Sequence, residues 1–354
     1  MQKRFLQAVL AAGLLATTLP ALSAKPKLDI RAYQQPDGLV ATFKSGTVAD
    51  PYFGMYGLEL AARAGLDVTD ARNKLVQWGL RHQQDSGRFP RFCRDPSSSP
   101  SASSTPTSTP KAPTWRACGR ADSDDATLSR WLVLLVRAAP PGPLPPAWQL
   151  SYDKAWAVLE TLRMGNGVYS VFPPGTPGYE GYALFKDNVE VLDSLRALAS
   201  LHAGRGDHVQ GRALEARALS LATAMAEHFG AEPVRLERLA LGASYANSSF
   251  YPHKVAAPFA WLEGYTRPEA AQWQAWLDEN TAAWDANAKA DFPWGLVAVA
   301  AGKAGRYDVG CRWLERYRAQ RKADVRWNVL EEISAQVVQH QLTSTASRCP
   351  ALGR

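Results

Sequence analysis

Apolar residues recur every three to four positions along most of the chain, which is the pattern of amphipathic α-helices. Alternating β-branched runs are almost absent, so few strands are expected. The helical segments, rich in Ala, Leu and Trp, are expected at 50–64, 68–84, 123–138, 151–164, 187–203, 208–229, 253–265, 268–287, 293–304, 308–320 and 326–342. They follow one another in pairs. Successive helix pairs predict an all-α fold, a single (α/α)5-6 toroid of helical hairpins, with a right-handed helical solenoid as the alternative.

The N-terminus differs from this helical pattern. Lys3 and Arg4 precede an apolar run over 5–19, and small residues then allow cleavage after Ser23 or Ala24. This order is typical of a secretory signal peptide, and an uncleaved anchor is the alternative. We therefore expect a periplasmic or secreted protein without a membrane span after cleavage.

The remaining sequence indicates one main domain. We divide the chain into a signal peptide at 1–24, an N-terminal extension at 25–48, the toroid domain at 49–345 and a C-terminal tail at 346–354. Within the domain, 96–113 is rich in Ser, Thr and Pro and has no hydrophobic periodicity. That composition predicts a flexible, disordered insertion.

Charge, cysteine content and the absence of known motifs limit the classes of partner and cofactor that we expect. The formal net charge of +7 falls to +5 without the two basic residues of the leader, and no Lys/Arg run forms a nucleic-acid patch. Four cysteines in an exported chain favour disulfides; three pairings exist, and we favour Cys93–Cys118 and Cys311–Cys349 because each pair is local. The chain has no CxxC, HExxH, GxSxG or P-loop motif, so we expect no metal and no cofactor.

The starts of every second helix combine acidic or amide residues with aromatic ones. If these helices line a toroid, their N-termini converge on one rim. Helix capping explains the acids but does not require the aromatics. Aromatic faces beside carboxylates are what a sugar-binding cleft needs, because rings stack on the apolar faces of pyranoses. The expected sugar platforms are Tyr52, Tyr56, Trp115, Tyr179, Tyr251, Trp294 and Trp327.

Two acidic groups are candidates for catalysis. Asp122, Asp124 and Asp125 lie within four residues, and mutual repulsion should raise the pKa of one of them, as a general acid requires. Asp187 and Glu190 share one helical face and can supply the second carboxylate. Helix capping is the competing interpretation for both groups.

Two basic residues are candidates for substrate binding. Arg88 follows the predicted C-cap Gly87, and with Arg91 and Arg94 it can bind an anionic substrate or pair with the acids at 122–125. A surface turn is the alternative. His253 at a helix start should have a lowered pKa and can bind substrate or act as a base, although a structural role is the alternative.

The sequence DSGRFP at 85–90, the acidic helix start after it and the succession of hairpins resemble the six-hairpin glycosidases. The likeness spans most of 45–345. It implies an exported, monomeric enzyme that hydrolyses a polysaccharide or oligosaccharide through two carboxylates. Asp124 or Asp125 would donate the proton, and Asp187 or Glu190 would be its partner.

A second, shorter resemblance leads to another function. The DSDD sequence at 122–125 is similar to the DxDD motif of class II terpene cyclases, and Gln83-xxx-Gly87-x-Phe89 resembles the QxxxGxW repeat of these prenyltransferase-like toroids. This likeness implies that Asp124 protonates an alkene or epoxide. A non-catalytic periplasmic protein that binds glycans or assists polysaccharide assembly is the third hypothesis, and glycoside hydrolysis is preferred.

Overall fold

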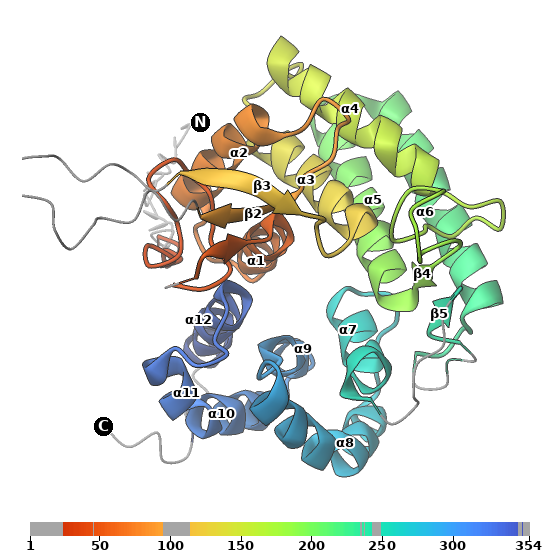
Figure 1. Cartoon of the computed structure of the whole chain (residues 1–354). Helices are drawn as coiled ribbons and strands as arrows, with labels where there is room; N and C mark the ends of the chain where they lie inside the picture. Colours follow the sequence, from red (N-terminus) through yellow and green to blue (C-terminus); the bar gives the residue numbers. More distant parts are fainter. Residues whose placement is uncertain are drawn as a thin grey trace, which may run out of the picture.

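The computed structural model describes residues 24–44, 46–94, 114–233, 236, 238–242, 249–345 and 349. The predicted leader up to residue 23, the predicted insertion at 96–113 and most of the predicted tail lie outside these residues. The described part is mainly α-helical, and its helices agree with the predicted segments to within a few residues in most cases (Figure 1). It also contains two small sheets.

Six helices of the described part are buried over most of their length. In α3, thirteen consecutive residues are buried, so the helix has no solvent face over that stretch. The six are α1 (Pro51–Arg63), α3 (Asp124–Ala138), α5 (Phe185–Gly204), α7 (Ala256–Leu262), α9 (Gly295–Lys303) and α12 (Val329–Ser344).

The other long helices bury one face only. They are α2 (Thr69–His82), α4 (Pro146–Leu162), α6 (His208–His228), α8 (Ala270–Ala290) and α10 (Tyr307–Arg316). The short elements η2 (Phe250–Lys254), a π-helix, and α11 (Arg318–Ala323) precede α7 and α12.

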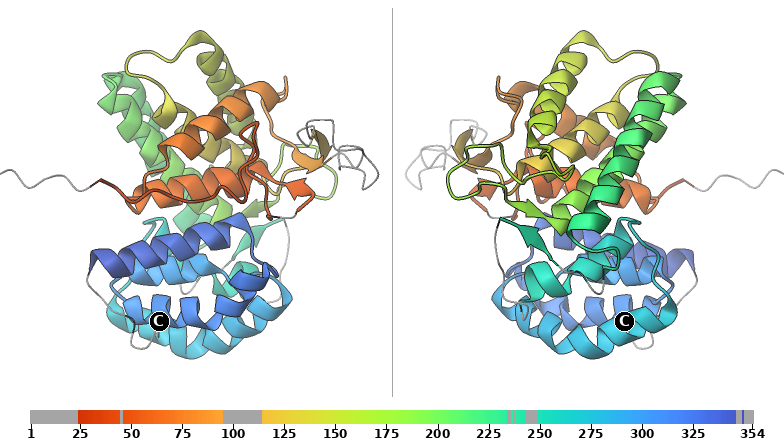
Figure 2. Two further views of the ribbon diagram at one scale, coloured as in Figure 1. Left: turned by 90° about the vertical axis from the view of Figure 1, so that its left-hand side faces the viewer. Right: turned by 90° about the vertical axis from the view of Figure 1, so that its right-hand side faces the viewer.

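The buried helices contact one another in chain order. Helix α1 packs against α3, α3 against α5, α5 against α7, α7 against α9 and α9 against α12, and α12 packs against α1. The sequence of contacts therefore closes on itself (Figure 1). Figure 2 shows that α1–α6 occupy one half of the molecule and α7–α12 the other.

The two sheets lie at the beginnings of buried helices. Strands β1 (Val48–Ala49), β2 (Arg91–Arg94) and β3 (Trp115–Gly119) are antiparallel in the order β1-β2-β3. Strand β4 (Ala183–Leu184) pairs with β5 (Ala240–Leu241), also antiparallel. Because β1, β3 and β4 lead into α1, α3 and α5, the sheets fix where these helices start.

Both predicted disulfides are present. Cys93–Cys118 links β2 to β3, and Cys311–Cys349 links α10 to the chain beyond α12. Structural disulfides are typical of proteins outside the reducing cytoplasm. Within the described ranges, no helix combines the length and the apolar character needed to cross a bilayer.

Replacing Cys93 and Cys118 together by Ser should lower the free energy of unfolding by about 2–4 kcal/mol. The bond closes a loop with a sequence separation of 25 residues, and its loss frees the unfolded chain. Urea unfolding under oxidising conditions measures the effect, with the oxidised wild-type protein as the reference. An unchanged unfolding midpoint would contradict this account.

Candidate functional site

Two adjoining cavities lie at the N-terminal ends of the buried helices. Their volumes are about 200 and 350 Å³, and Asp122 and Tyr251 line both of them. We call the two together the Asp122 cleft. The smaller cavity receives side chains from the first turns of α1, α5 and α12, and the larger one from α5 and the loop that leads to β4.

Aromatic side chains form much of the lining of the Asp122 cleft. Tyr251 stacks on Trp294, with ring centroids 5.3 Å apart and planes 20° from parallel. The backbone of Trp294 is left-handed, with φ 51°, which is uncommon for a bulky residue and directs the chain into α9. The other aromatic residues of the lining are Tyr52, Phe53 and Phe292 in the smaller cavity and Phe172, Tyr179 and Tyr182 in the larger one.

Asp187 is an acid of the larger cavity with an altered proton affinity. It lies in the first turn of α5 and is only 4% exposed. Burial raises its pKa to about 7; the nearby ammonium of Lys186 opposes this shift, while Glu190 and Asp122 add to it. Asp187 therefore still carries a proton in a large fraction of molecules near neutral pH.

Asp122 is the exposed acid of the cleft. Its backbone N–H donates a hydrogen bond to Oδ2 of Asp50 at 2.9 Å. Asp50 also caps α1 by accepting from the N–H of Tyr52 at 3.2 Å. One buried carboxyl thus ties Asp122 to the start of α1. Burial, with the nearby Asp122, raises the pKa of Asp50 to about 6 despite the opposing Arg91.

Glu331 is a third acid of the lining, in the smaller cavity. Its Oε2 accepts a hydrogen bond from the N–H of Gly295 at 2.8 Å. Burial raises its pKa to about 8, and the charge of Asp291 adds to the shift. The sequence predicts a helix here, but nothing in the local pattern shows that α12 turns this position inward.

Replacing Glu331 by Gln should flatten the pH dependence of stability. Between pH 4.5 and about 8 the folded protein keeps this proton and the unfolded chain releases it, so stability falls as pH rises. The slope should become shallower by about 1.4 kcal/mol per pH unit in this window. Denaturant unfolding at pH 5–8 measures it, with the exposed Glu215→Gln as matched control. Parallel profiles for wild type and Glu331→Gln would refute the assignment.

Glu190 lies beneath the cleft and does not line it. Its side chain is fully buried, and its Oε1 accepts hydrogen bonds from the Tyr52 hydroxyl at 2.8 Å and the Lys186 ammonium at 2.7 Å. Lys186 also donates to the Tyr52 oxygen at 3.1 Å. Since Tyr52 and Lys186 both line the smaller cavity, Glu190 holds two groups of the floor in place.

Asp124 and Asp125, the predicted proton donors, line neither cavity. Asp124 is 1% exposed, and its Oδ2 lies 2.5 Å from the guanidinium of Arg88. Asp125 is fully buried and accepts from the N–H of Ala126 at 2.8 Å. Burial, followed by repulsion from Asp187, raises the pKa of Asp125 well above its usual range. Of the acids at 122–125, only Asp122 lines the cleft.

Three of the predicted aromatic platforms are buried away from the cleft. Tyr56 donates its hydroxyl to Glu263 at 2.5 Å. Trp115 lies in β3 and is 8% exposed. Trp327 is 1% exposed, stacks on Trp313 and donates to Glu332 at 3.0 Å. The structure brings together Tyr52, Tyr179, Tyr251 and Trp294 from the predicted set.

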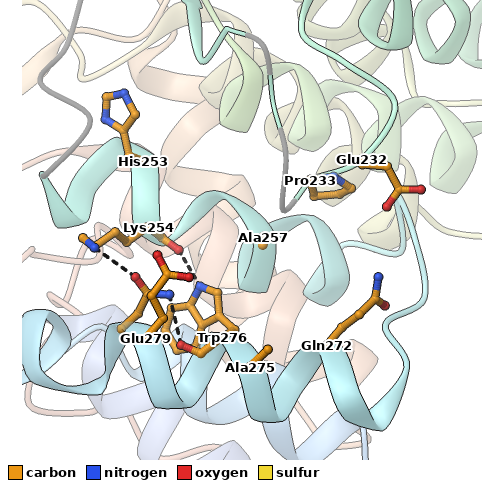
Figure 3. A pocket seen from close by; sticks show the side chains of 10 residues that line it. Glu232, Pro233, His253, Lys254, Ala257, Gln272, Ala275, Trp276 and Glu279 are labelled. Atoms are coloured by element: carbon orange, nitrogen blue, oxygen red, sulfur yellow. Dashed lines mark hydrogen bonds between the residues drawn. The ribbon is translucent and has the colours of Figure 1, made fainter.

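His253 lines a different cavity, of about 700 Å³, between α8 and the segment formed by η2 and α7 (Figure 3). Its Nδ1 lies 3.0 Å from the Ser249 hydroxyl, and burial lowers its pKa. Next to it, Lys254 donates to Asn280 at 3.1 Å and accepts through its carbonyl from Trp276 at 2.8 Å. His253 is therefore separate from the acids of the Asp122 cleft.

The chain matches no protein-family model and no curated protein. The function is therefore inferred from the geometry of the cleft. Within the described ranges, no group of three His, Cys, Asp or Glu side chains is arranged to hold a metal ion.

A buried ionic network lies deeper among the helices, and local sequence gives no sign of it. Arg130 is 1% exposed and contacts Asp193 at 2.5 Å, Glu263 at 3.0 Å and Glu190 at 3.6 Å. Arg63 bonds the same Asp193 at 2.9 Å and Glu263 at 2.7 Å. The network joins α1, α3 and α5 to the residue that follows α7.

The Gln83-xxx-Gly87-x-Phe89 sequence forms a structural turn. The Gln83 amide donates to the carbonyls of Gly87 at 2.9 Å and Ser151 at 3.1 Å, which ties the end of α2 to α4. Gly87 has φ +88°, and a Cβ there would lie 2.4 Å from the carbonyl oxygen of Lys154. Phe89 packs edge-on against Trp131 in the core.

Proposed function

We propose that the chain is an exported glycoside hydrolase in which Asp187 donates the proton and Asp122 is the second carboxylate. The observation that carries the proposal is that these two acids line one cavity among aromatic rings, with the pKa of Asp187 raised to about 7. Glycoside hydrolysis needs one carboxyl that keeps a proton and one that does not. Burial lets Asp187 keep its proton, and Asp122 is an exposed acid of the same cavity.

We further propose that the helices form an (α/α)6 toroid. The closed succession of contacts from α1 to α12 and back supports it, with the amphipathic helices outside. Export to the periplasm or the medium is supported by the leader sequence and by the two disulfides.

In the proposed reaction, a sugar ring stacks on the aromatic lining near Tyr251 and Trp294, and the glycosidic oxygen faces Asp187. Asp187 protonates this oxygen as the bond to the anomeric carbon breaks. Asp122, as the carboxylate, either activates water or attacks the anomeric carbon. Glu190 acts indirectly, by holding Tyr52 and Lys186 in the floor.

The charged residues among the aromatic lining favour a glycan over an isoprenoid. The smaller cavity contains Asp122, Lys186, Asp291 and Glu331, whereas a cyclase encloses an apolar chain in an apolar cavity. Asp124, which the cyclase motif would use as acid, is paired with Arg88. A glycan-binding protein without catalysis would use the same aromatic lining but would not need the proton on Asp187.

A screen for reducing-sugar release from bacterial and plant polysaccharides tests the proposal. The wild type should release sugar ends from at least one of them, and the Asp122→Asn and Asp187→Asn proteins should not. Asp153→Asn, an exposed acid on α4, is the matched control and should retain activity. Retention of a glycan without cleavage, unchanged in both variants, would favour the binding protein instead.

A further inference from the structure

Five arginines lie on or next to strands β2 and β3, and one of them, Arg120, contacts rings of the Asp122 cleft. Two of them are matched by buried acids: Arg88 contacts Asp124 at 2.5 Å and Arg91 contacts Asp50 at 3.3 Å. The other three form no ion pair with an acid anywhere in the described ranges, and they are Arg94, Arg116 and Arg120.

The hairpin presents Arg116 outward. Arg116 is exposed and lies opposite Cys93 in the ladder, on the face that carries the disulfide. The other face holds Phe92 and Trp115, which are buried. Because side chains alternate along a strand, burial of this face keeps Arg116 toward solvent.

Arg120, which follows β3 in the chain, lies at the edge of the Asp122 cleft. Its guanidinium carbon lies 4.9 Å from the ring centroid of Phe172 and 5.1 Å from that of Tyr179. Both rings line the larger cavity, together with Asp122 and Asp187. A cation thus lies within cation–π distance of two aromatic rings at the edge of the proposed catalytic cavity.

We propose that the glycan substrate is anionic and that Arg116 and Arg120 bind its carboxylate or sulfate groups where it enters the cleft. The inference rests on the proposed hydrolase function and adds the substrate class. The planar fork of a guanidinium matches carboxylate and sulfate oxygens, and an exposed arginine without an acidic partner is available for them. A glycan carries these charges on ring substituents, away from the glycosidic oxygen that the acids must reach.

A nucleic acid is disfavoured as the occupant. Its charge lies along a continuous phosphate backbone, which would run past the acids Asp122 and Asp187 in the cleft. Among the described residues, no Lys or Arg lines the larger cavity itself, where the aromatic rings stand beside these acids.

Titration calorimetry with the Asp187→Asn protein tests the proposal without cleavage of the probe. The probes are polygalacturonate, highly methyl-esterified polygalacturonate, dextran sulfate and dextran. Polygalacturonate or dextran sulfate should bind, and its neutral counterpart should bind at least tenfold more weakly. Tighter binding of polygalacturonate would indicate a carboxylate site, and tighter binding of dextran sulfate a sulfate site. Binding should weaken as NaCl rises from 50 to 500 mM.

Arginine variants locate the binding surface. In the same background, R116Q/R120Q should weaken binding of the polyanion about tenfold. R212Q/R267Q, which removes two exposed positive charges elsewhere, should change it less than twofold. R116K/R120K keeps the charge and should retain part of the affinity.

Three results would overturn the proposal: equal binding of charged and neutral probes, equal losses in both Gln variants, or equal affinity for single-stranded DNA of matched charge. Cleavage of a neutral glycan with no binding of either polyanion would refute this inference and leave the hydrolase proposal standing. Binding of a polyanion through Arg116 and Arg120 without cleavage by the wild type would do the reverse.

Discussion

In the proposed hydrolase, replacing Asp187 by Asn should lower kcat by about 10²–10⁴-fold on a glycan that is cleaved in the reducing-sugar screen. Asn has nearly the shape of Asp but cannot give a proton to the leaving oxygen, and this is the usual size of general-acid catalysis. Steady-state release of reducing ends measures the loss. The Asp153→Asn protein, changed by the same atom on an exposed helix face, should keep the wild-type rate.

The pH dependence gives this prediction a second readout. The proton donor must be protonated, so wild-type activity should fall as pH rises through about 7, where burial places the pKa of Asp187. The residual activity of Asp187→Asn should lack this alkaline limb. Its stability at pH 8 should be no lower than that of wild type, because Asn removes a buried carboxylate. An unchanged rate or an unchanged alkaline limb would exclude Asp187 as the donor.

Replacing Arg130 by Met should lower the free energy of unfolding by about 3–5 kcal/mol. The guanidinium is 1% exposed and contacts three acids, of which Glu190 and Glu263 are themselves buried. Met fills similar space, so the loss reports uncompensated negative charge and not a cavity. Equilibrium unfolding in guanidinium chloride, followed by tryptophan fluorescence, measures it.

The matched control for Arg130 is an exposed ion pair. Asp308 contacts Arg312 at 3.1 Å on the surface of α10, and Asp308→Asn should change stability by about 1 kcal/mol or less. If the free energy of unfolding of Arg130→Met also lay within about 1 kcal/mol of the wild-type value, the buried ionic network would not stabilise the fold as proposed.

The helices and the disulfides follow from local sequence. Periodicity places the helices because each outer helix must bury one face, and Cys93 and Cys118 lie close in the chain. The meeting of Asp122, Asp187, Tyr251 and Trp294 follows from the repeated acid-and-aromatic helix starts, since helices that begin on one side bring their first turns together. The helices, the disulfides and the meeting of these four residues can therefore be predicted from residues that lie close together in the sequence.

The direction in which each acidic side chain points cannot be predicted from the sequence pattern. Successive residues of a helix point about 100° apart, so Asp124 and Asp125 cannot share one direction, and Asp122 lies outside the helix, before the N-cap Ser123. Helix α3 is buried on all sides, and its sequence gives no polar face from which to read the rotation. The Arg130–Glu263 contact joins residues 133 apart, and only the assembled fold brings them together. Trp115 and Trp327 were predicted as sugar platforms for the same reason. An aromatic residue beside a helix start can also pack into the core, and the sequence does not distinguish the two cases.

The smaller cavity of the Asp122 cleft is built by the two ends of the described chain. Tyr52 and Phe53 come from the first long helix, and Asn328, Leu330 and Glu331 come from the last. The N–H of Val329 donates to the carbonyl of Thr42 at 2.9 Å, which joins the start of α12 to the segment that precedes α1. A nascent chain carries Asp122 and Asp187 long before it carries α12. Completion of the cleft therefore has to wait until α12 has been synthesised, although both acids are already present by then.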